Sequence, residues 1–338
     1  MDFDFSDEQY LLRDALRNLL ARECTPQHVR AMWDDPTGRS PQRWRRLAEM
    51  GVLGLCLPES AGAFGGDEVD MVLLLEEAGR HVLPEPLLEH AALAAPVLAR
   101  AGSSAQQSQW LPRLAAGDAI ATVGLSAQRY VPDAGTADVV VLEAGGDLHL
   151  LTPDRLTLEP VRSVDGARRL FRVTAETGPE TLLPGGREAL PWLTDHAAAG
   201  TAAVLVGIAA ALLDRTLDYV KVREQFGKRI GAFQAVQHKL AETWVLLEMA
   251  RGAVYYAAYA LANALPDAGV AVSVAKAAAG DAQHRANQEA LQLHGGIGFT
   301  WEHDLHLWLK RGKALEPAYG DADHHRRRIA DHIYATAG

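Results

Sequence analysis

Two long helical segments joined by a short connector constrain the fold of this chain more than any other feature. An apolar helical run ends near Val222, and from Gln234 to Leu265 apolar side chains recur with the 3.6-residue period of a helix. The same period occurs elsewhere in the C-terminal part, which therefore divides into predicted helical pieces over roughly 188–222, 234–265, 268–293 and 301–335.

The connector carries Arg223, Phe226, Gly227 and Gly231. A connector that only reversed the chain would need turn residues alone. A guanidinium, an aromatic ring and two glycines beside a helix start instead suit a flat ligand that bears phosphate. The alternative is that Phe226 covers the core, the glycines bend the chain and Arg223 forms a solvated pair with Glu224. The residues by themselves leave both interpretations open.

The first third of the chain is predicted to be helical. Ser6 and Gln9 form a capping box, and Ser40 followed by Pro41 marks a second helix start. Further helices are expected over about 67–81, 91–98 and 105–114.

From about Ala119 to Leu190, short β-branched runs broken by Gly, Pro and Asp replace the helical period. Gly145-Gly146 followed by Asp147, between two such runs, predicts a β-hairpin. We therefore expect three domains: an N-terminal helical domain over 1–118, a reduced β-sheet domain over 119–187 and a C-terminal helical domain over 188–338.

Composition excludes several classes of partner. The net charge of -10 argues against nucleic acid, because neutralising phosphates requires clustered Lys and Arg. The longest apolar run, 197–213, is interrupted by Gly200 and Gly207 and is too short for a membrane span, so it predicts a buried core helix. We expect no membrane partner.

Cysteine and histidine usage indicates neither a disulfide framework nor a metal site. Cys24 and Cys56 lie far apart without CxxC spacing, and the acidic N-terminus MDFDFSDE lacks the pattern of a signal peptide, which favours the cytoplasm. The histidine pairs lack a consistent ligand spacing with a carboxylate, so we expect solvated or capping roles for His303, His306, His324 and His325.

Two motifs in the C-terminal part, REQFGKRIGAFQAVQHKLAE and ALQLHGGIGFTWEHDL, follow the helices and the small sheet in an order that resembles the acyl-CoA dehydrogenase family. The earlier stretches LAEMGVLGLCLPESAGAFGG and WLPRLAAGDAIAT are also similar to that family, and the resemblance covers almost the whole chain. It implies a mostly α fold with a small β domain: an N-terminal helical domain, a small β-sheet domain and a C-terminal four-helix bundle. It also implies FAD as cofactor and an acyl-CoA thioester as substrate.

In that family two subunits share each FAD, and two segments grip its dinucleotide end. We call residues 223–234 the first clasp and residues 292–296 the second clasp. The resemblance places Arg223 and Gln225 on the pyrophosphate, Phe226 beside the adenosine portion, and Ile230, Phe233 and Gln234 around the adenine and ribose. The second clasp comprises Gln292, Leu293, His294, Gly295 and Gly296.

The pattern departs from the family where the catalytic base normally stands. Members remove the α-proton of the thioester with a glutamate from one of two positions, and this chain carries Tyr319 at the commoner position and Ala197 at the other. A tyrosine with a pKa near 10 stays protonated at neutral pH. Asp321 is a weak candidate base, but Asp195, His196 and Asp321 are expected to be helix caps or surface charges.

The sheet domain departs as well, because GLSAQRYVPDAGTAD stands where the family usually holds the flavin ring and the acyl group. The chain thus lacks the usual glutamate and the usual sheet motif but keeps both clasps. This combination indicates the smaller, base-lacking subunit of a heteromeric (α2β2) enzyme, whose larger paralogous subunit supplies the glutamate. The resemblance extends to actinobacterial assemblies that act on steroid side-chain CoA thioesters. Two alternatives stay open: a self-sufficient homo-oligomeric enzyme that uses Asp321, and a flavin-free structural paralogue.

Overall fold

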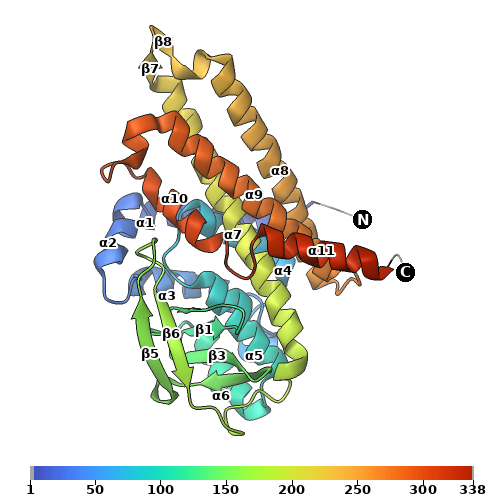
Figure 1. The fold of residues 1–338 in the computed structure, drawn as a ribbon. Helices are drawn as coiled ribbons and strands as arrows, with labels where there is room; N and C mark the ends of the chain where they lie inside the picture. Colours follow the sequence, from blue (N-terminus) through green and yellow to red (C-terminus); the bar gives the residue numbers. More distant parts are fainter. Residues whose placement is uncertain (1–3, 337–338) are drawn as a thin grey trace. The chain divides into compact units, whose positions relative to one another are not determined.

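A computed structural model describes residues 4–336 of the chain (Figure 1). Helices account for most of these residues and the strands lie in the middle of the sequence, so the predicted architecture, mostly α with a small β part, is confirmed. The N-terminal third contains α1 (Asp7–Glu23), α2 (Pro26–Asp34), α3 (Pro41–Glu49), η1 (Val52–Gly54), η2 (Glu59–Ala61), α4 (Glu68–Arg80), the π-helical turn η3 (Leu88–Ala94), α5 (Ala95–Ala101) and α6 (Ser104–Ala115).

Local sequence explains where these helices begin. The Ser6 side chain accepts a hydrogen bond from the backbone of Gln9, whose own side chain accepts from the backbone of Ser6, so the predicted capping box is present. Ser103 and Gln106 repeat this arrangement at α6. The helix expected over 91–98 is longer, because a π-helical turn with its wider hydrogen-bond spacing runs directly into α5. Helix α2 was missed by the sequence pattern.

Six strands between Ala121 and Ala175 form two three-stranded sheets. One has the order β1-β3-β4, with β1 parallel to β3 and β3 antiparallel to β4, and the other has the antiparallel order β2-β6-β5. Gly145 and Gly146, both with positive φ, join β3 to β4 as the predicted hairpin. The strands are β1 (Ala121–Gly124), β2 (Val131–Pro132), β3 (Val139–Ala144), β4 (Asp147–Leu151), β5 (Leu156–Val161, preceded by η4, Pro153–Arg155) and β6 (Leu170–Ala175).

The C-terminal part is a bundle in which α8 packs along α9 and α11 packs on α9 (Figure 1). The last predicted helix, 301–335, is wrong as one piece: a turn over 316–321 separates α10 from α11, because Tyr319 and Gly320 both adopt positive φ, which a helix cannot accommodate. The elements are α7 (Gly186–Val222), β7 (Glu224–Gln225), β8 (Lys228–Arg229), η5 (Ile230–Ala232), α8 (Gln234–Ala262), α9 (Ala268–His294), η6 (Gly295–Phe299), α10 (Leu305–Leu315) and α11 (Ala322–Thr336).

Helix α7 is long and apolar enough to cross a membrane by length and composition alone. However, 94% of its most apolar 18-residue window is buried inside the structure. Ala197 and Leu213 are among the buried residues of this helix. The burial agrees with the prediction of a core helix.

The chain contacts divide the molecule into two units whose borders differ from those of the expected domains. The first unit combines the residues up to Gln27 with Val72–Leu83 and the chain from Thr201 onward. The second unit combines His28–Met71 with Pro84–Gly200 and holds both three-stranded sheets. The division into domains over 1–118, 119–187 and 188–338 stays a prediction.

Candidate cofactor-binding site

The first clasp is a short antiparallel hairpin that projects from the end of α7 (Figure 1). Glu224 pairs with Arg229 and Gln225 pairs with Lys228, while the backbone N–H of Ile230 donates to the carbonyl of Arg223 at 2.8 Å and closes the base. Its two turn residues, Phe226 and Gly227, both have positive φ, at 57° and 77°. This is the geometry of a two-residue β-hairpin turn that matches the twist of the strands.

The turn holds Phe226 in a conformation that L-residues with large side chains rarely adopt, at a cost of roughly 1 kcal/mol. The ring is also 92% exposed, although it lies edge-on to Phe233 with the ring centres 6.3 Å apart. The alternative interpretation, in which Phe226 covers the core, is therefore wrong, because the core does not reach this ring. A strained, exposed aromatic ring at the tip of a hairpin is instead suited to contact a flat group from outside the chain.

Helix α8 follows the hairpin after the short helix η5, with Phe233 at its N-cap and no side-chain hydrogen bond to the cap. The first N–H groups of the helix, beginning with Gln234, carry its positive dipole end. The guanidinium of Arg223 is exposed and has no ion-pair partner among residues 4–336. This end of the bundle therefore presents a full cation and a helix N-terminus, both of which favour an anion such as phosphate.

The second clasp forms the C-terminal end of α9 and the start of η6. Gln292 is exposed, and the backbone N–H of Gly295 donates back to the carbonyls of Gln292 and Leu291. Gly295 has φ +63°, and neither Gly295 nor Gly296 has another atom within 4 Å of the position where a Cβ would stand. The turn therefore leaves open space in which a ligand can approach the backbone closely.

His294 does not lie with the other side chains of the second clasp. Its ring is buried, its Nδ1 donates to the carbonyl of Ala290 at 2.7 Å, and it stacks on Tyr219 with the ring centres 4.3 Å apart. Only its backbone remains available to a ligand at this turn. Sequence reasoning missed this role of Tyr219, and no periodicity would have revealed it, because Tyr219 and His294 lie 75 residues apart.

Tyr319, predicted from the sequence to occupy the commoner position of the glutamate, is only 7% exposed and adopts φ 55°. Its carbonyl accepts from the Nε2 of buried His325 at 3.0 Å, and the following carbonyl, of Gly320, accepts from the Lys276 ammonium. Asp321 begins the next helix: its Oδ1 accepts from the backbone N–H of His324 at 2.8 Å, and this bond holds the pKa of Asp321 below its ordinary value. Asp321 is thus a helix cap, as expected, and a weaker base than an ordinary carboxylate.

Ala197, predicted from the sequence to occupy the alternative position, is fully buried in α7. Its neighbour His196 is also buried: Nε2 lies 2.6 Å from a Glu68 carboxylate oxygen, Nδ1 lies 2.7 Å from the carbonyl of Trp192, and the ring stacks on Trp192. The carbonyl of Trp192 and the carboxylate of Glu68 both act as acceptors for this imidazole. They require either a proton on each ring nitrogen of His196 or a proton on Glu68, and the pKa of Glu68 is lowered. His196 is therefore an internal pair partner rather than the cap or surface charge expected from the sequence.

The chain belongs to the acyl-CoA dehydrogenase family. The family's C-terminal domain matches residues 185–334 and its N-terminal domain matches residues 6–118. The chain is similar to the acyl-CoA dehydrogenase IpdE2 of Mycobacterium tuberculosis, with 37% identity over 90% of this chain and 91% of that protein. It is also 33% identical to IpdE2 of Mycolicibacterium smegmatis, over 97% of this chain and 100% of that protein.

Solved structures give the same assignment. The chain is similar to one in a variant of the Tcur3481-Tcur3483 steroid acyl-CoA dehydrogenase, with a TM-score of 0.90, 30% identity and coverage of 98% and 99% of the two chains. It is also similar to a chain of the ChsE4-ChsE5 complex of Mycobacterium tuberculosis, with a TM-score of 0.89, 25% identity and 99% coverage of each chain. Enzymes of this family are FAD-dependent and dehydrogenate acyl-CoA thioesters.

The residues of the two clasps fit the dinucleotide part of FAD. Arg223 offers a guanidinium without an ion-pair partner among the described residues, and Gln225 and Gln292 offer exposed amides. The Cβ positions of Gly227 and Gly295 face open space that a ligand can fill. A cation, amides and bare backbone are the donors that a pyrophosphate flanked by flat ring systems requires.

Proposed function

We propose that this chain is the smaller subunit of an α2β2 acyl-CoA dehydrogenase that introduces an α,β double bond into a CoA thioester. Its clasps contact an FAD held mainly by a larger paralogous subunit, and that subunit supplies the catalytic glutamate. One observation carries this proposal. Both positions that normally hold the glutamate contain buried residues without a carboxylate, Tyr319 and Ala197, whereas the side chains of Arg223, Gln225 and Gln292 in the clasps are exposed.

The chemistry of this chain is then that of binding and orientation. Arg223 neutralises the charge of the pyrophosphate, and Gln225 and Gln292 donate hydrogen bonds through their amides. Phe226 shields the adenosine portion of FAD from water. When bound, FAD supplies the acceptor for the hydride that leaves the β-carbon of the thioester. No proton transfer is assigned to a residue of this chain, because neither Tyr319 nor Ala197 carries the carboxylate that removes the α-proton.

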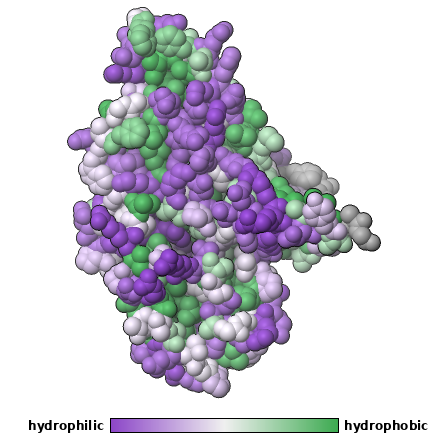
Figure 2. Space-filling view, in the orientation of Figure 1, coloured by the Kyte–Doolittle hydropathy of each residue, from purple (hydrophilic) through white to green (hydrophobic). Residues whose placement is uncertain are grey.

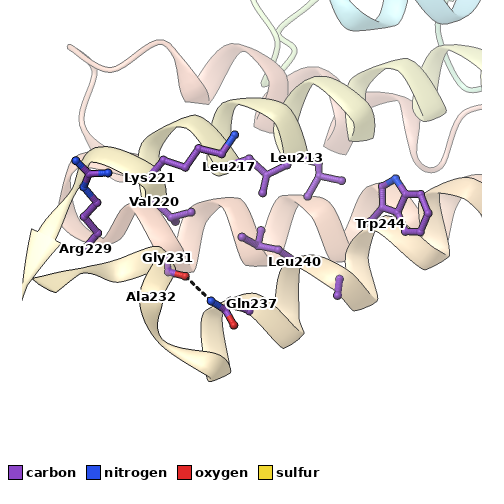
Figure 3. A pocket seen from close by; sticks show the side chains of 11 residues that line it. Leu213, Leu217, Val220, Lys221, Arg229, Gly231, Ala232, Gln237, Leu240 and Trp244 are labelled. Carbon is purple, nitrogen blue, oxygen red and sulfur yellow. Dashed lines mark hydrogen bonds between the residues drawn. The ribbon is translucent and has the colours of Figure 1, made fainter.

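A partner chain is supported by an apolar surface on the bundle. Helix α8 exposes Trp244, Val245 and Met249, of which Met249 is 67% exposed. Beside them lies a groove of about 590 Å³ between α7 and α8 (Figure 3), and it is lined by Leu213, Leu217, Val220, Lys221, Arg229, Gly231, Ala232, Gln237, Leu240, Ala241 and Trp244. Hydrophobic residues also reach the surface where β7, β8 and the start of α8 meet (Figure 2). Such a patch is typical of a protein interface.

We infer that a larger paralogous subunit covers this surface, because two of the similar solved structures each name two proteins, Tcur3481-Tcur3483 and the ChsE4-ChsE5 complex. One of them is described as a steroid enzyme, which favours a steroid-derived acyl group for the substrate. The location we expect for the assembly is the cytoplasm.

The direct test is to isolate the tagged chain from its native host and to compare it with the chain produced alone. We expect a second, larger acyl-CoA dehydrogenase chain to co-purify in equal amount, with FAD bound to the complex and dehydrogenase activity confined to it. Stoichiometric FAD together with full activity in the lone chain would contradict the proposal and support a self-sufficient enzyme. A complex without flavin would support a structural paralogue.

A further inference from the structure

A residue just before the first clasp, Tyr219, and a residue within the second clasp, His294, are stacked on each other. Tyr219 lies one helical turn before Arg223, and its carbonyl accepts the backbone N–H of Arg223 at 2.9 Å. His294 directly precedes Gly295 at the end of α9. The two rings are 18° from parallel with centres 4.3 Å apart, so one ring pair joins the last turn of α7 to the last turn of α9.

The histidine ring is fixed in orientation and in charge. Its Nδ1 donates to the carbonyl of Ala290, and burial, followed by the nearby His303 and Arg215, lowers the pKa of His294. The imidazole is therefore neutral at neutral pH and carries its hydrogen on Nδ1. The phenol O–H of Tyr219 adds a long contact of 3.5 Å to the carbonyl of His294.

A third ring extends the array to the next helix. His303 lies edge-on to His294, with ring centres 5.0 Å apart and an angle of 67°. The Nδ1 of His303 accepts the backbone N–H of Leu305, the first residue of α10, at 3.2 Å. The array thus connects three helix ends: those that carry the two clasps and the one that follows the second clasp.

The clasps themselves have little internal support. The first clasp is an exposed two-stranded hairpin, which is marginal alone, and the glycines at both turns face open space. Their relative position is therefore set by the helix ends from which they emerge. Binding groups need positions held to about 0.5 Å, and locked packing beneath them provides that precision.

We propose that Tyr219 and His294 are positioning residues of the FAD site, because their stacked rings fix the two clasps relative to each other. The inference rests on the proposed function in that the clasps bind FAD. Neither side chain needs to touch the cofactor. Loss of the stack displaces the clasps, whereas loss of the phenol oxygen alone does not.

The tagged chain is isolated from its host together with its assembly, and FAD is removed from the assembly. FAD is then titrated back and its binding is followed by fluorescence. Thermal unfolding of the assembly is measured in parallel. We expect Tyr219→Leu and His294→Leu each to weaken FAD binding about 10-fold. Tyr219→Phe and His294→Phe, which keep a ring, should stay within about twofold of wild type. The double leucine variant should be no weaker than either single one, because both remove the same contact. Two separate leucine variants keep the test valid if one of them does not fold.

The Trp192–His196 stack provides a matched control. It lies on the same helix α7 but in the other unit, with ring centres 3.7 Å apart. Trp192→Leu should lower the melting temperature and leave FAD affinity unchanged. If Tyr219→Leu and His294→Leu behave in the same way as Trp192→Leu, the positioning role is overturned.

Arg223→Ala separates this inference from the proposed function. If Arg223→Ala weakens FAD binding and the ring variants do not, only the positioning role fails. If Arg223→Ala also leaves FAD binding unchanged, the first clasp does not bind the cofactor and the proposed function fails with it.

Discussion

The ammonium of Lys276 lies 2.6 Å from the carbonyl oxygen of Gly320, in the turn that joins α10 to α11. It also donates to the carbonyl of Glu316 at 2.9 Å, and the lysine side chain is completely buried. A buried cation therefore holds the backbone of the turn that contains Tyr319. Lys276 and His325, which donate to backbone carbonyls of this turn, are both fully buried, so the turn is anchored in the core.

Lys276 predicts a rise of stability in mildly alkaline solution. Burial lowers its pKa from 10.5 to about 8, so between these values the unfolded chain binds a proton that the folded chain lacks. The contribution of Lys276 to the free energy of unfolding therefore increases as the pH rises from 8. Between pH 8 and 9.5 it should amount to about 2 kcal/mol. Urea unfolding of wild type and Lys276→Met at both pH values measures it, and equal pH dependence in the two proteins would contradict this charge state.

Arg223→Ala should lower the FAD content of the isolated assembly. A guanidinium bonded to pyrophosphate contributes about 1.5–3 kcal/mol, so FAD affinity should fall about 10- to 100-fold and the wild-type affinity should weaken with salt. Arg223→Lys should recover part of the loss, because it keeps the charge but not the fork of donors. Arg172→Ala is the control, because Arg172 lies on β6, outside both clasps and the groove, where it pairs with exposed Glu159 at 2.6 Å. An equal effect of the two alanine variants would indicate general loss of charge instead of a specific contact.

Asp321→Asn should leave turnover of the assembly unchanged. Asparagine caps a helix as well as aspartate does, so this variant removes only the charge, whereas Asp321→Ala also removes the cap of α11 and should cost about 1 kcal/mol. Steady-state rates and thermal unfolding of both variants separate the two roles. Abolished turnover in Asp321→Asn at unchanged stability would show that this carboxylate is the base and that the chain is self-sufficient.

Gly207→Ala should destabilise the protein far more than Gly252→Ala. A Cβ at Gly207 would lie 1.9 Å from the carbonyl oxygen of Glu76 in α4, so α4 and α7 would have to separate. The cost should exceed about 3 kcal/mol. Gly252 lies in α8 with no atom within 4 Å of its added Cβ, and alanine there should stabilise by about 0.5–1 kcal/mol. Thermal melts of both variants provide the comparison, and similar melting temperatures would contradict the close helix crossing.

The sequence indicated the helices whose starts are encoded locally. Ser6 and Ser103 cap their own helices through residues three positions away, and Gly145-Gly146 adopts the turn that its lack of side chains permits. The break at 316–321 was not predictable in this way. The positive φ of Tyr319 is maintained by His325 and Lys276, which reach the turn from two different helices.

The same distinction holds for the candidate site. The residue types of the two clasps, from Arg223 to Gln234 and from Gln292 to Gly296, were identified from the sequence because motifs of neighbouring residues carry them. Their exposure, the buried position of His294 and its stack on Tyr219 depend on which helix ends meet in space. The sequence by itself therefore determined the family, the local caps and the residue types of the two proposed clasps. Only the tertiary structure decided which rings stack beside the clasps and which side chains are buried, because those contacts join residues that are distant along the chain.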